Sequence, residues 1–268
     1  MTNLRGTATS VALAGLLSLG LTACGSSTDS PAGAGAATTA TTKAAADAKT
    51  ALAASTTELK TGNYALAATT PDMKVTGSVH VPSKSGALKM DISSEGTTFT
   101  MELIGVTPDR WVRIGSSDPQ LRSFLGDGKS WSHLDTSKIK KGGDLDIDVT
   151  TADVLGLDPL IKGATTVKGD AKNVAGIIDA TKIEAEDSLL DSDDIKAMGP
   201  AAATLPFTAT LDDRGRLVSL VIDAPKAGDT PAGKWSYTLS GYGEQKAQTK
   251  PKGTVKEISD QQLSLLNG

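Results

Sequence analysis

The chain is poor in the residue types that build reactive or covalently cross-linked sites. Its 268 residues include one Cys, two His and only three each of Trp, Tyr and Phe. A single Cys cannot form an internal disulfide or a thiolate-rich zinc or iron–sulfur site. An excess of positive charge is also missing, because 27 basic side chains face 31 acidic ones. Without a broad basic field the chain has little to attract a phosphate backbone, and we expect no nucleic-acid partner.

Familiar catalytic and metal-binding motifs are absent or incomplete. There is no G-x-S-x-G, H-E-x-x-H or phosphate-loop sequence. Residues 137–140 match S-x-x-K and residues 60–62 match K-T-G, but their order is wrong for a penicillin-binding enzyme and the S-D-N element is missing. The alternating acids of 144–148 resemble the start of a calcium loop, yet Val149 stands where Gly is required and Leu155 where a bidentate Glu is required. We therefore interpret these acids as the solvated face of a strand.

The remaining candidate residues have plain structural explanations. His80 falls in a strand pattern and His133 lies near Trp131, and neither has a second His at metal-ligand spacing. The acidic residues between 184 and 194 could attract a cation, but the exposed flank of a helix explains them equally well. We expect no catalytic residue, no metal ligand and no cofactor, and hence no enzyme.

The first 23 residues have the pattern of a signal peptide. Arg5 supplies a positive start, residues 11–21 are apolar, and Leu21-Thr22-Ala23-Cys24 places small residues before a cysteine. The apolar run is well short of the ~20 residues that span a bilayer. This is similar to the lipobox of bacterial lipoproteins, which implies cleavage between Ala23 and Cys24 and acylation of Cys24. An ordinary secretory signal or an uncleaved anchor is the alternative interpretation.

Residues 24–42 have the composition of a flexible tether. After Cys24 the stretch contains one acid, no base and nothing larger than Thr or Pro. Such a segment cannot bury enough surface to order itself. We therefore expect one folded domain from residue 43 to 268, lipid-anchored at the extracytoplasmic face of the cell membrane.

Alternation of apolar and polar residues predicts that the domain is mainly antiparallel sheet. The predicted strands lie near 73–81, 88–92, 99–103, 112–114, 129–134, 145–149, 165–168, 174–183, 204–211, 216–223 and 234–242. Helical spacing predicts three helical segments, at 43–61, 151–163 and 189–198. About ten strands with three helical segments indicate an α+β fold, a strongly curved half-barrel sheet with helices packed on its concave face.

The order of these segments resembles a known family. The layout resembles that of the LppX/LprG-type actinobacterial lipoproteins, which are similar in fold to the LolA and LolB carriers. It consists of a lipobox, a small-residue tether, an opening helix, strands, a helical insertion at 151–163 and further strands. The resemblance to that family extends to four short sequences, at residues 167–170, 176–179, 213–218 and 237–243. The resemblance implies a protein that holds acyl chains of a lipid or glycolipid and carries or presents them in the envelope, with an envelope transporter as a further expected partner. The polar stretch after Pro251 is an extension beyond that layout.

A cavity between sheet and helices is also predicted from the residues themselves. Few large apolar side chains must cover a broad sheet in which Ala, Gly and Thr fill many positions. The candidate lining residues are apolar positions of two neighbouring strands and of the insertion: Leu88, Met90, Ile92, Phe99, Met101, Leu103, Val154, Leu155 and Leu157. A closely packed core made of small residues is the alternative. A module that binds a protein partner or senses envelope state without lipid remains the second function class.

Overall fold

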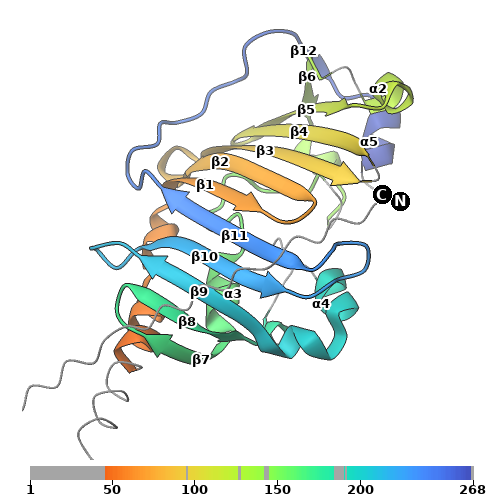
Figure 1. The fold of residues 1–268 in the computed structure, drawn as a ribbon. Helices are drawn as coiled ribbons and strands as arrows, with labels where there is room; N and C mark the ends of the chain where they lie inside the picture. Colours follow the sequence, from red (N-terminus) through yellow and green to blue (C-terminus); the bar gives the residue numbers. More distant parts are fainter. Residues whose placement is uncertain are drawn as a thin grey trace, which may run out of the picture.

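The computed structural model describes residues 46–94, 96–125, 128–141, 145–183, 190 and 192–266. Its main element is one large, curved and open β-sheet, with the helical segment α3 behind the strands in the view of Figure 1. The strands are β1 Asn63–Thr69, β2 Met73–His80, β3 Ser85–Ser94, β4 Thr97–Val106, β5 Asp109–Ser116, β6 Trp131–Leu134, β7 Ala164–Gly169, β8 Asn173–Ile178, β9 Leu205–Leu211, β10 Leu217–Ala224, β11 Gly233–Ser240 and β12 Val255–Glu257.

The strand order is β12-β6-β5-β4-β3-β2-β1-β11-β10-β9-β8-β7. Neighbouring strands pair antiparallel, except that β12 runs parallel to β6. The α+β class with a curved antiparallel sheet is thus confirmed, with twelve strands where the sequence indicated about ten. Two connections join strands that are not neighbours: β6 to β7 at the far edge of the sheet, and β11 to β12 beside β6. Strand β11 pairs with β1 at the middle of the sheet.

Alternation missed strand β1, as it missed the short C-terminal strand β12. The outward positions of β1 carry Ala65 and Ala67, and the buried positions are Tyr64, Leu66 and Ala68. Because alanine occupies positions on both faces, the apolar–polar contrast along the strand is weak. The strand forms nonetheless, since it pairs with β2 and β11 on both sides.

The helical segments are short. Residues 46–54 form a helix, followed by η1 Thr57–Thr61, and the later segments are η2 Val81–Ser83, α2 Pro119–Leu125, η3 Thr136–Lys138, α3 Leu157–Lys162, η4 Ala180–Lys182, α4 Ser192–Met198, η5 Gly199–Thr204 and α5 Asp260–Leu266. The helix expected at 43–61 is therefore split, and within the described residues only the second half of 151–163 is helical. In that segment the carboxylate of Asp153 accepts hydrogen bonds from the backbone N–H groups of Leu157 (2.9 Å) and Asp158 (2.7 Å), which starts α3 late.

The prediction of a strand at residues 145–149 is wrong. Leu145 and Val149 are buried as the alternation implied, but the segment makes turns and pairs with no strand. Asp148 accepts a hydrogen bond from the N–H of Thr150 (3.0 Å) and forms an ion pair with Arg110 (3.3 Å). These local interactions hold the backbone in turns instead of a strand. The side chains of Leu145 and Val149 therefore pack into the core from a loop.

The C-terminal stretch is not a free polar tail. Gln248 donates its backbone N–H to the Ser85 hydroxyl (2.9 Å) and its amide to the Ser78 hydroxyl (3.2 Å), so the chain crosses β2 and β3. It then adds β12 beside β6 and ends in α5, at the edge of the sheet in Figure 1. The extension after Pro251 thereby covers an edge strand that would otherwise expose unpaired backbone groups.

Candidate functional site

The side of the sheet that faces α3, here called the inner face, carries apolar side chains in transverse rows. Register pairing places Met73, Ile92 and Phe99 side by side in the first row. The second row runs through Val75, Met90, Met101 and Ile114, and the third through Gly77, Leu88, Leu103 and Val112. The six strand residues predicted to share a face are therefore brought together as three directly opposed pairs, Leu88 with Leu103, Met90 with Met101 and Ile92 with Phe99.

Burial of these rows changes steadily along the strands. All three side chains of the first row are partly exposed, and in the second row Met101 and Ile114 are partly exposed while Met90 is buried. In the third row the side chains of Leu88, Leu103 and Val112 are all buried, with Leu103 only 1% exposed. The inner face of β2–β5 thus has a closed end, at the third row and beyond, and an open end, at the first row.

The closed end is sealed by direct contact between a loop and the sheet. Gly86 and Gly105 lie opposite each other on β3 and β4. A Cβ on Gly86 would lie 1.9 Å from the carbonyl oxygen of Val149, and one on Gly105 would lie 2.7 Å from a Val149 methyl group. The hydroxyl of Tyr64 donates to the carbonyl of Ala152 (2.5 Å) and fixes the same loop. The insertion residues Leu155 and Leu157 are buried in the same core cluster, and Val154 packs against it partly exposed.

The partly buried carboxyl group of Asp153 supports this closed end. Burial raises the pKa of Asp153, against the opposing effect of its two backbone hydrogen bonds to Asp158 and Leu157. Since those bonds cap α3, the group's role is to position Leu157 and its neighbours over the sheet. We assign it no chemical role.

Two polar groups on the inner face have no hydrogen-bond partner among the described residues. They are the indole N–H of Trp235 and the hydroxyl of Tyr237, both on β11, whose side chains are 3% and 1% exposed. Tyr237 pairs with Ala68, which pairs with Val75, so it continues the second row. Burial raises the pKa of Tyr237, and the carboxylate of Asp194 raises it further, so the phenol remains neutral and able to donate.

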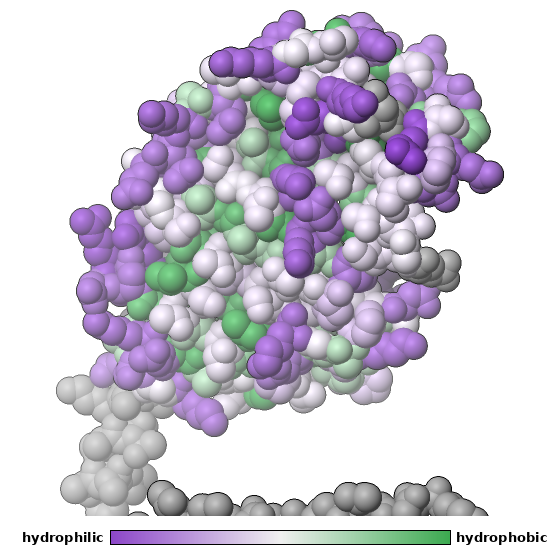
Figure 2. All heavy atoms as spheres, turned by 45° about the horizontal axis from the view of Figure 1, so that its top comes forward, coloured by the Kyte–Doolittle hydropathy of each residue, from purple (hydrophilic) through white to green (hydrophobic). Residues whose placement is uncertain are grey.

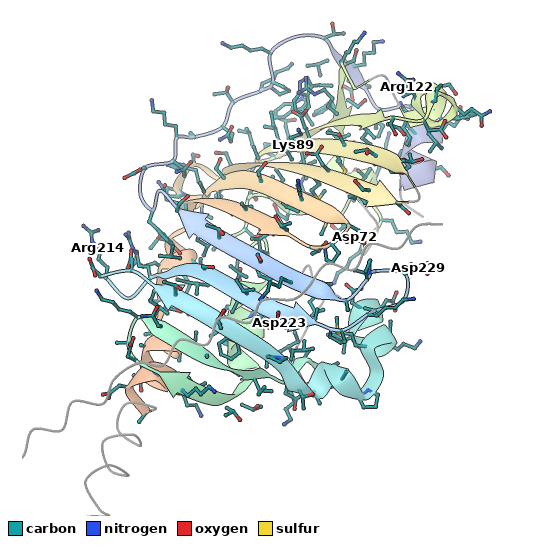
Figure 3. The ribbon with its side chains drawn as sticks, in the orientation of Figure 1. Asp72, Lys89, Arg122, Arg214, Asp223 and Asp229 are labelled. Atoms are coloured by element: carbon teal, nitrogen blue, oxygen red, sulfur yellow. The ribbon has the colours of Figure 1, made fainter. Side chains whose placement is uncertain are left out.

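The opposite side of the sheet is polar, and two shallow depressions lie among its described residues. Figure 2 shows hydrophilic side chains spread over the side turned to the viewer, among small apolar areas, and Lys89 of β3 lies on it in Figure 3. One depression, of about 380 Å³, lies over β4 and β5, where Arg113 pairs with Glu102 (2.5 Å) and stacks over the Trp131 ring (4.6 Å).

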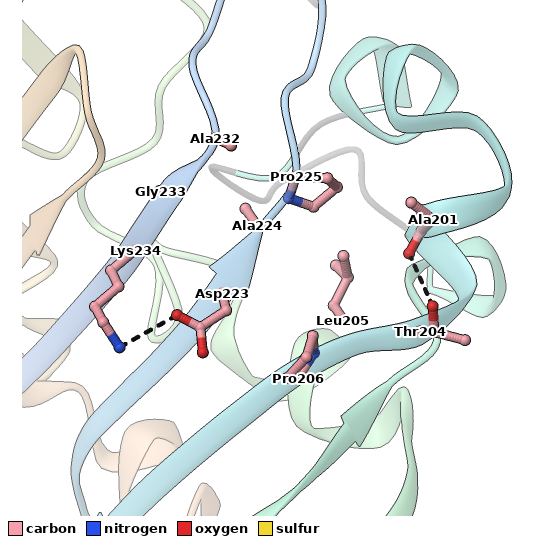
Figure 4. A pocket seen from close by; sticks show the side chains of 10 residues that line it. All are labelled: Ala201, Thr204, Leu205, Pro206, Asp223, Ala224, Pro225, Ala232, Gly233 and Lys234. Atoms are coloured by element: carbon pink, nitrogen blue, oxygen red, sulfur yellow. Dashed lines mark hydrogen bonds and ion pairs between the residues drawn. The ribbon is translucent and has the colours of Figure 1, made fainter.

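The other depression, of about 590 Å³, lies where β9, β10 and β11 meet η5 (Figure 4). Its charged groups, Lys234 and Asp223, already pair at 3.2 Å. Its remaining lining is mostly small or apolar: Ala201, Thr204, Leu205, Pro206, Ala224, Pro225, Ala232 and Gly233. The partly exposed first-row residues line neither depression.

The two histidines occupy structural positions. His80 Nδ1 lies 2.6 Å from the Ser83 hydroxyl within the turn that ends β2. His133 lies between Asp109 of β5 (2.9 Å) and Glu257 of β12 (3.0 Å) and holds the C-terminal strand. Burial alone would lower the pKa of His133, but hydrogen bonds to Glu257 and Asp109 outweigh it and raise the pKa above its ordinary value.

The rejected motifs also have local explanations. Ser137 donates its N–H and hydroxyl to the Asp135 carboxylate (3.0 and 2.6 Å), as in the start of a helical turn. Across the part of the chain that the structure describes, no group of three or more His, Cys, Asp or Glu side chains could hold a metal ion. Asp144 and the acids at 184–187 lie outside that part.

The lipobox and tether also lie outside the described residues, Ala23 and Cys24 included. No helix within the described ranges is long and apolar enough to cross a membrane. The chain matches no protein-family model, and no curated protein is significantly similar to it.

Sequence reasoning missed Trp235 and Tyr237 as candidate site residues. Their spacing in the predicted strand 234–242 places both on one face, and this was the available signal. Their place beside the second row depends on β1, which joins β11 to β2 and which alternation did not reveal.

Proposed function

We propose that the protein is a membrane-anchored lipoprotein whose folded part binds the acyl chains of a lipid or glycolipid on the inner face of β2–β5. The observation that carries the proposal is the gradient of burial along three apolar rows. Apolar side chains of the first row are partly exposed although they continue a buried core. A ligand that covers them removes more apolar surface from water without opening the closed end.

An acyl chain suits this surface better than a polar ligand. The first and second rows consist of aliphatic, thioether and aromatic side chains: Met73, Ile92, Phe99, Val75, Met90, Met101 and Ile114. Each methylene group that leaves water contributes ~0.8 kcal/mol, so a long chain binds without a charged contact. Methionine side chains adapt their shape to an irregular apolar partner, which favours acyl chains of differing length.

The role in the envelope rests on the N-terminal sequence. Acylation of Cys24 would hold the protein on the membrane, because two or more acyl chains anchor a protein stably without a spanning helix. Residues 24–42 would then let the domain approach the lipid headgroups. We propose transport or presentation of lipid, as the resemblance to LppX/LprG-type lipoproteins implies, with no catalytic step and with an envelope transporter as acceptor or donor.

Replacement of Cys24 tests the anchor separately from the binding surface. With Cys24→Ala the protein has no other thiol to acylate. We expect an unprocessed precursor that takes up no radiolabelled palmitate in cells. Uptake of label by the variant, at the mature size, would refute the lipobox.

A charge placed on the inner face tests the ligand. Met101 and Thr98 lie on the same strand but on opposite faces. Met101→Glu should weaken binding of a fluorescent fatty-acyl probe by at least tenfold, because the carboxylate would be desolvated by the ligand, whereas Thr98→Glu should leave binding unchanged. Equal binding by both variants, or no binding by the parent protein after delipidation, would refute the proposal and favour a protein partner.

A further inference from the structure

The depression over β4 and β5 is built around a missing side chain. On the side of the sheet opposite the inner face, Gly115 of β5 lies directly across from Thr100 of β4. A Cβ on Gly115 would lie 3.4 Å from the Cα of Gly128, and both glycines line the depression. Its volume of about 380 Å³ is at the lower end of the ~300–1,000 Å³ of small-molecule sites. It can therefore hold a small ligand or one unit of a longer one.

An ion pair beside this glycine is fixed in place before any ligand binds. Glu102 and Arg113 are directly opposed on β4 and β5, next to Gly115 on the same side of the sheet. The guanidinium group of Arg113 donates to the Glu102 carboxylate (2.5 Å) and stacks on the Trp131 ring (4.6 Å). Even so, 29% of the Arg113 side chain and 28% of the Glu102 side chain remain exposed. Because their neighbours already order these two groups, a ligand that binds them loses little affinity to side-chain immobilisation.

Two hydroxyl groups that line the depression are also held by the protein and keep hydrogen-bonding capacity. Thr100 donates its hydroxyl to the Asp91 carboxylate (2.7 Å), which leaves the Thr100 oxygen able to accept. The Ser117 hydroxyl accepts the backbone N–H of Thr98 (2.9 Å), which leaves it able to donate. The ion pair uses Oε2 of Glu102, so Oε1 is left to accept from a ligand. The lining thus offers both donors and acceptors.

The chemistry of the lining selects a neutral ligand that is rich in hydroxyl groups. An anion would meet the Glu102 carboxylate and a cation would meet the Arg113 guanidinium group, and a zwitterion would have to displace the ion pair that already exists. An apolar ligand would remove water from polar groups without replacing their hydrogen bonds. A sugar hydroxyl both donates and accepts, so neighbouring hydroxyls of one ring can bind a fixed carboxylate and a fixed guanidinium group together.

We propose that the depression around Gly115 binds one unit of a neutral glycan. Glu102 accepts from the ring hydroxyls and Arg113 donates to them, and Thr100 and Ser117 complete the contact. The site lies on the side of the sheet opposite the apolar rows, so the inference goes beyond the proposed function and does not depend on it. The glycan unit can belong to a polysaccharide or to the headgroup of a lipid, because the ring chemistry is the same in both.

Saturation-transfer NMR of the parent protein with methyl glycosides of glucose, galactose, mannose and arabinose tests the site without any acyl chain. At least one glycoside should bind with a dissociation constant of about 1–10 mM, as expected for a few partly exposed hydrogen bonds. Neither sodium phosphate nor glycine betaine should displace it. Absence of binding by all four glycosides up to about 50 mM would overturn the inference, and displacement by phosphate or betaine would overturn the choice of a neutral ligand.

Three variants locate the bound sugar. Gly115→Ala fills part of the depression at the cost of an ordinary contact, and Glu102→Gln keeps the shape of the side chain but not its charge. Each should weaken glycoside binding about 3- to 10-fold and leave the melting temperature close to that of the parent. Asp223→Asn is the matched control, since it neutralises a carboxylate paired with Lys234 in the other depression and should leave affinity unchanged. Unchanged affinity in Glu102→Gln, or an equal loss in Asp223→Asn, would overturn the site.

The dodecyl glycoside of the bound sugar distinguishes the two sources of the glycan unit. If the unit is a lipid headgroup, Glu102→Gln and Met101→Glu should both weaken binding of the dodecyl glycoside. If it belongs to a polysaccharide, Glu102→Gln should weaken only the methyl glycoside and Met101→Glu only the dodecyl glycoside. Failure of the parent protein to bind a fatty-acyl probe, with methyl glycoside binding intact, would overturn the proposed function and leave this site standing.

Discussion

The two ends of the inner face of β2–β5 are built from the same strands and the same alternation, yet they differ in what covers them. At the closed end the third-row residues Leu88 and Leu103 are buried, and Val149 sits on Gly86 and Gly105. At the open end Ile92 and Phe99, directly opposed on the same two strands, remain partly exposed.

The comparison shows that side-chain type does not distinguish the buried end of the inner face from the partly exposed end. Leucines at the closed end and isoleucine, methionine and phenylalanine at the open end are all apolar. The difference comes from glycine, because only a residue without Cβ lets the Val149 backbone approach the sheet. At the first row, by contrast, the apolar side chains remain partly exposed.

Shortening one side chain at each end should produce the largest contrast in stability. Leu103→Ala leaves a cavity in a packed region and should lower the free energy of unfolding by about 2–5 kcal/mol. Ile92→Ala removes a partly exposed side chain and should cost only about 1 kcal/mol. Urea denaturation of both variants measures the difference, and equal losses would show that the open end is packed as tightly as the closed end.

Adding one methyl group at the seal should have the next largest effect. Gly86→Ala would place a Cβ against the Val149 carbonyl and should lower the free energy of unfolding by about 1–3 kcal/mol. Gly115→Ala in β5 is the control, since its nearest neighbour would be at 3.4 Å, an ordinary contact. If thermal melting ranks the two variants alike, the loop does not press on the sheet as described.

Protonation of His133 should have the smallest effect, and it concerns the C-terminal strand. The folded pKa of His133 is raised, so its contribution is complete below the unfolded value of about 6.5 and is lost as pH rises through the folded pKa. The His133 side chain is partly exposed, so the contribution is below about 1 kcal/mol. Hydrogen exchange of β12 should therefore be more protected at pH 6 than at pH 8, relative to β9 in the same sample.

The His133→Gln variant provides the control for this pH effect. It keeps a polar side chain but cannot gain a proton, so protection of β12 relative to β9 should no longer depend on pH. A pH dependence that survives in His133→Gln would assign the effect to another group.

Much of the fold follows from alternation in the sequence, because the inner face is a continuous apolar surface, buried at one end and partly exposed at the other. The pairs Leu88–Leu103, Met90–Met101 and Ile92–Phe99 were predicted to share a face, and the register confirms this. Alternation failed where side chains are small, as in β1, and where buried side chains belong to a loop, as in 145–149. Alternating apolar residues indicate which side chains are buried, and a side chain can be buried in a loop as well as in a strand.

The polar part of the candidate site could not be predicted in the same way. The polar atoms of Trp235 and Tyr237 have no partner among the residues that the structure describes, and partners depend on the packing of segments far apart in the chain. The closing of one end likewise depends on the approach of Val149 to Gly86, which lie 63 residues apart. No local pattern encodes either feature.

Quenching of tryptophan fluorescence by a brominated acyl chain tests the central claim most directly. Trp235 is the tryptophan on the inner face, whereas Trp111 and Trp131 lie beside His133 and Arg113 on the opposite side. At saturating ligand, the account predicts quenching in the parent protein and its loss in Trp235→Phe, which retains the other two tryptophans. Quenching that persists unchanged in Trp235→Phe would place the acyl chain elsewhere and contradict the account.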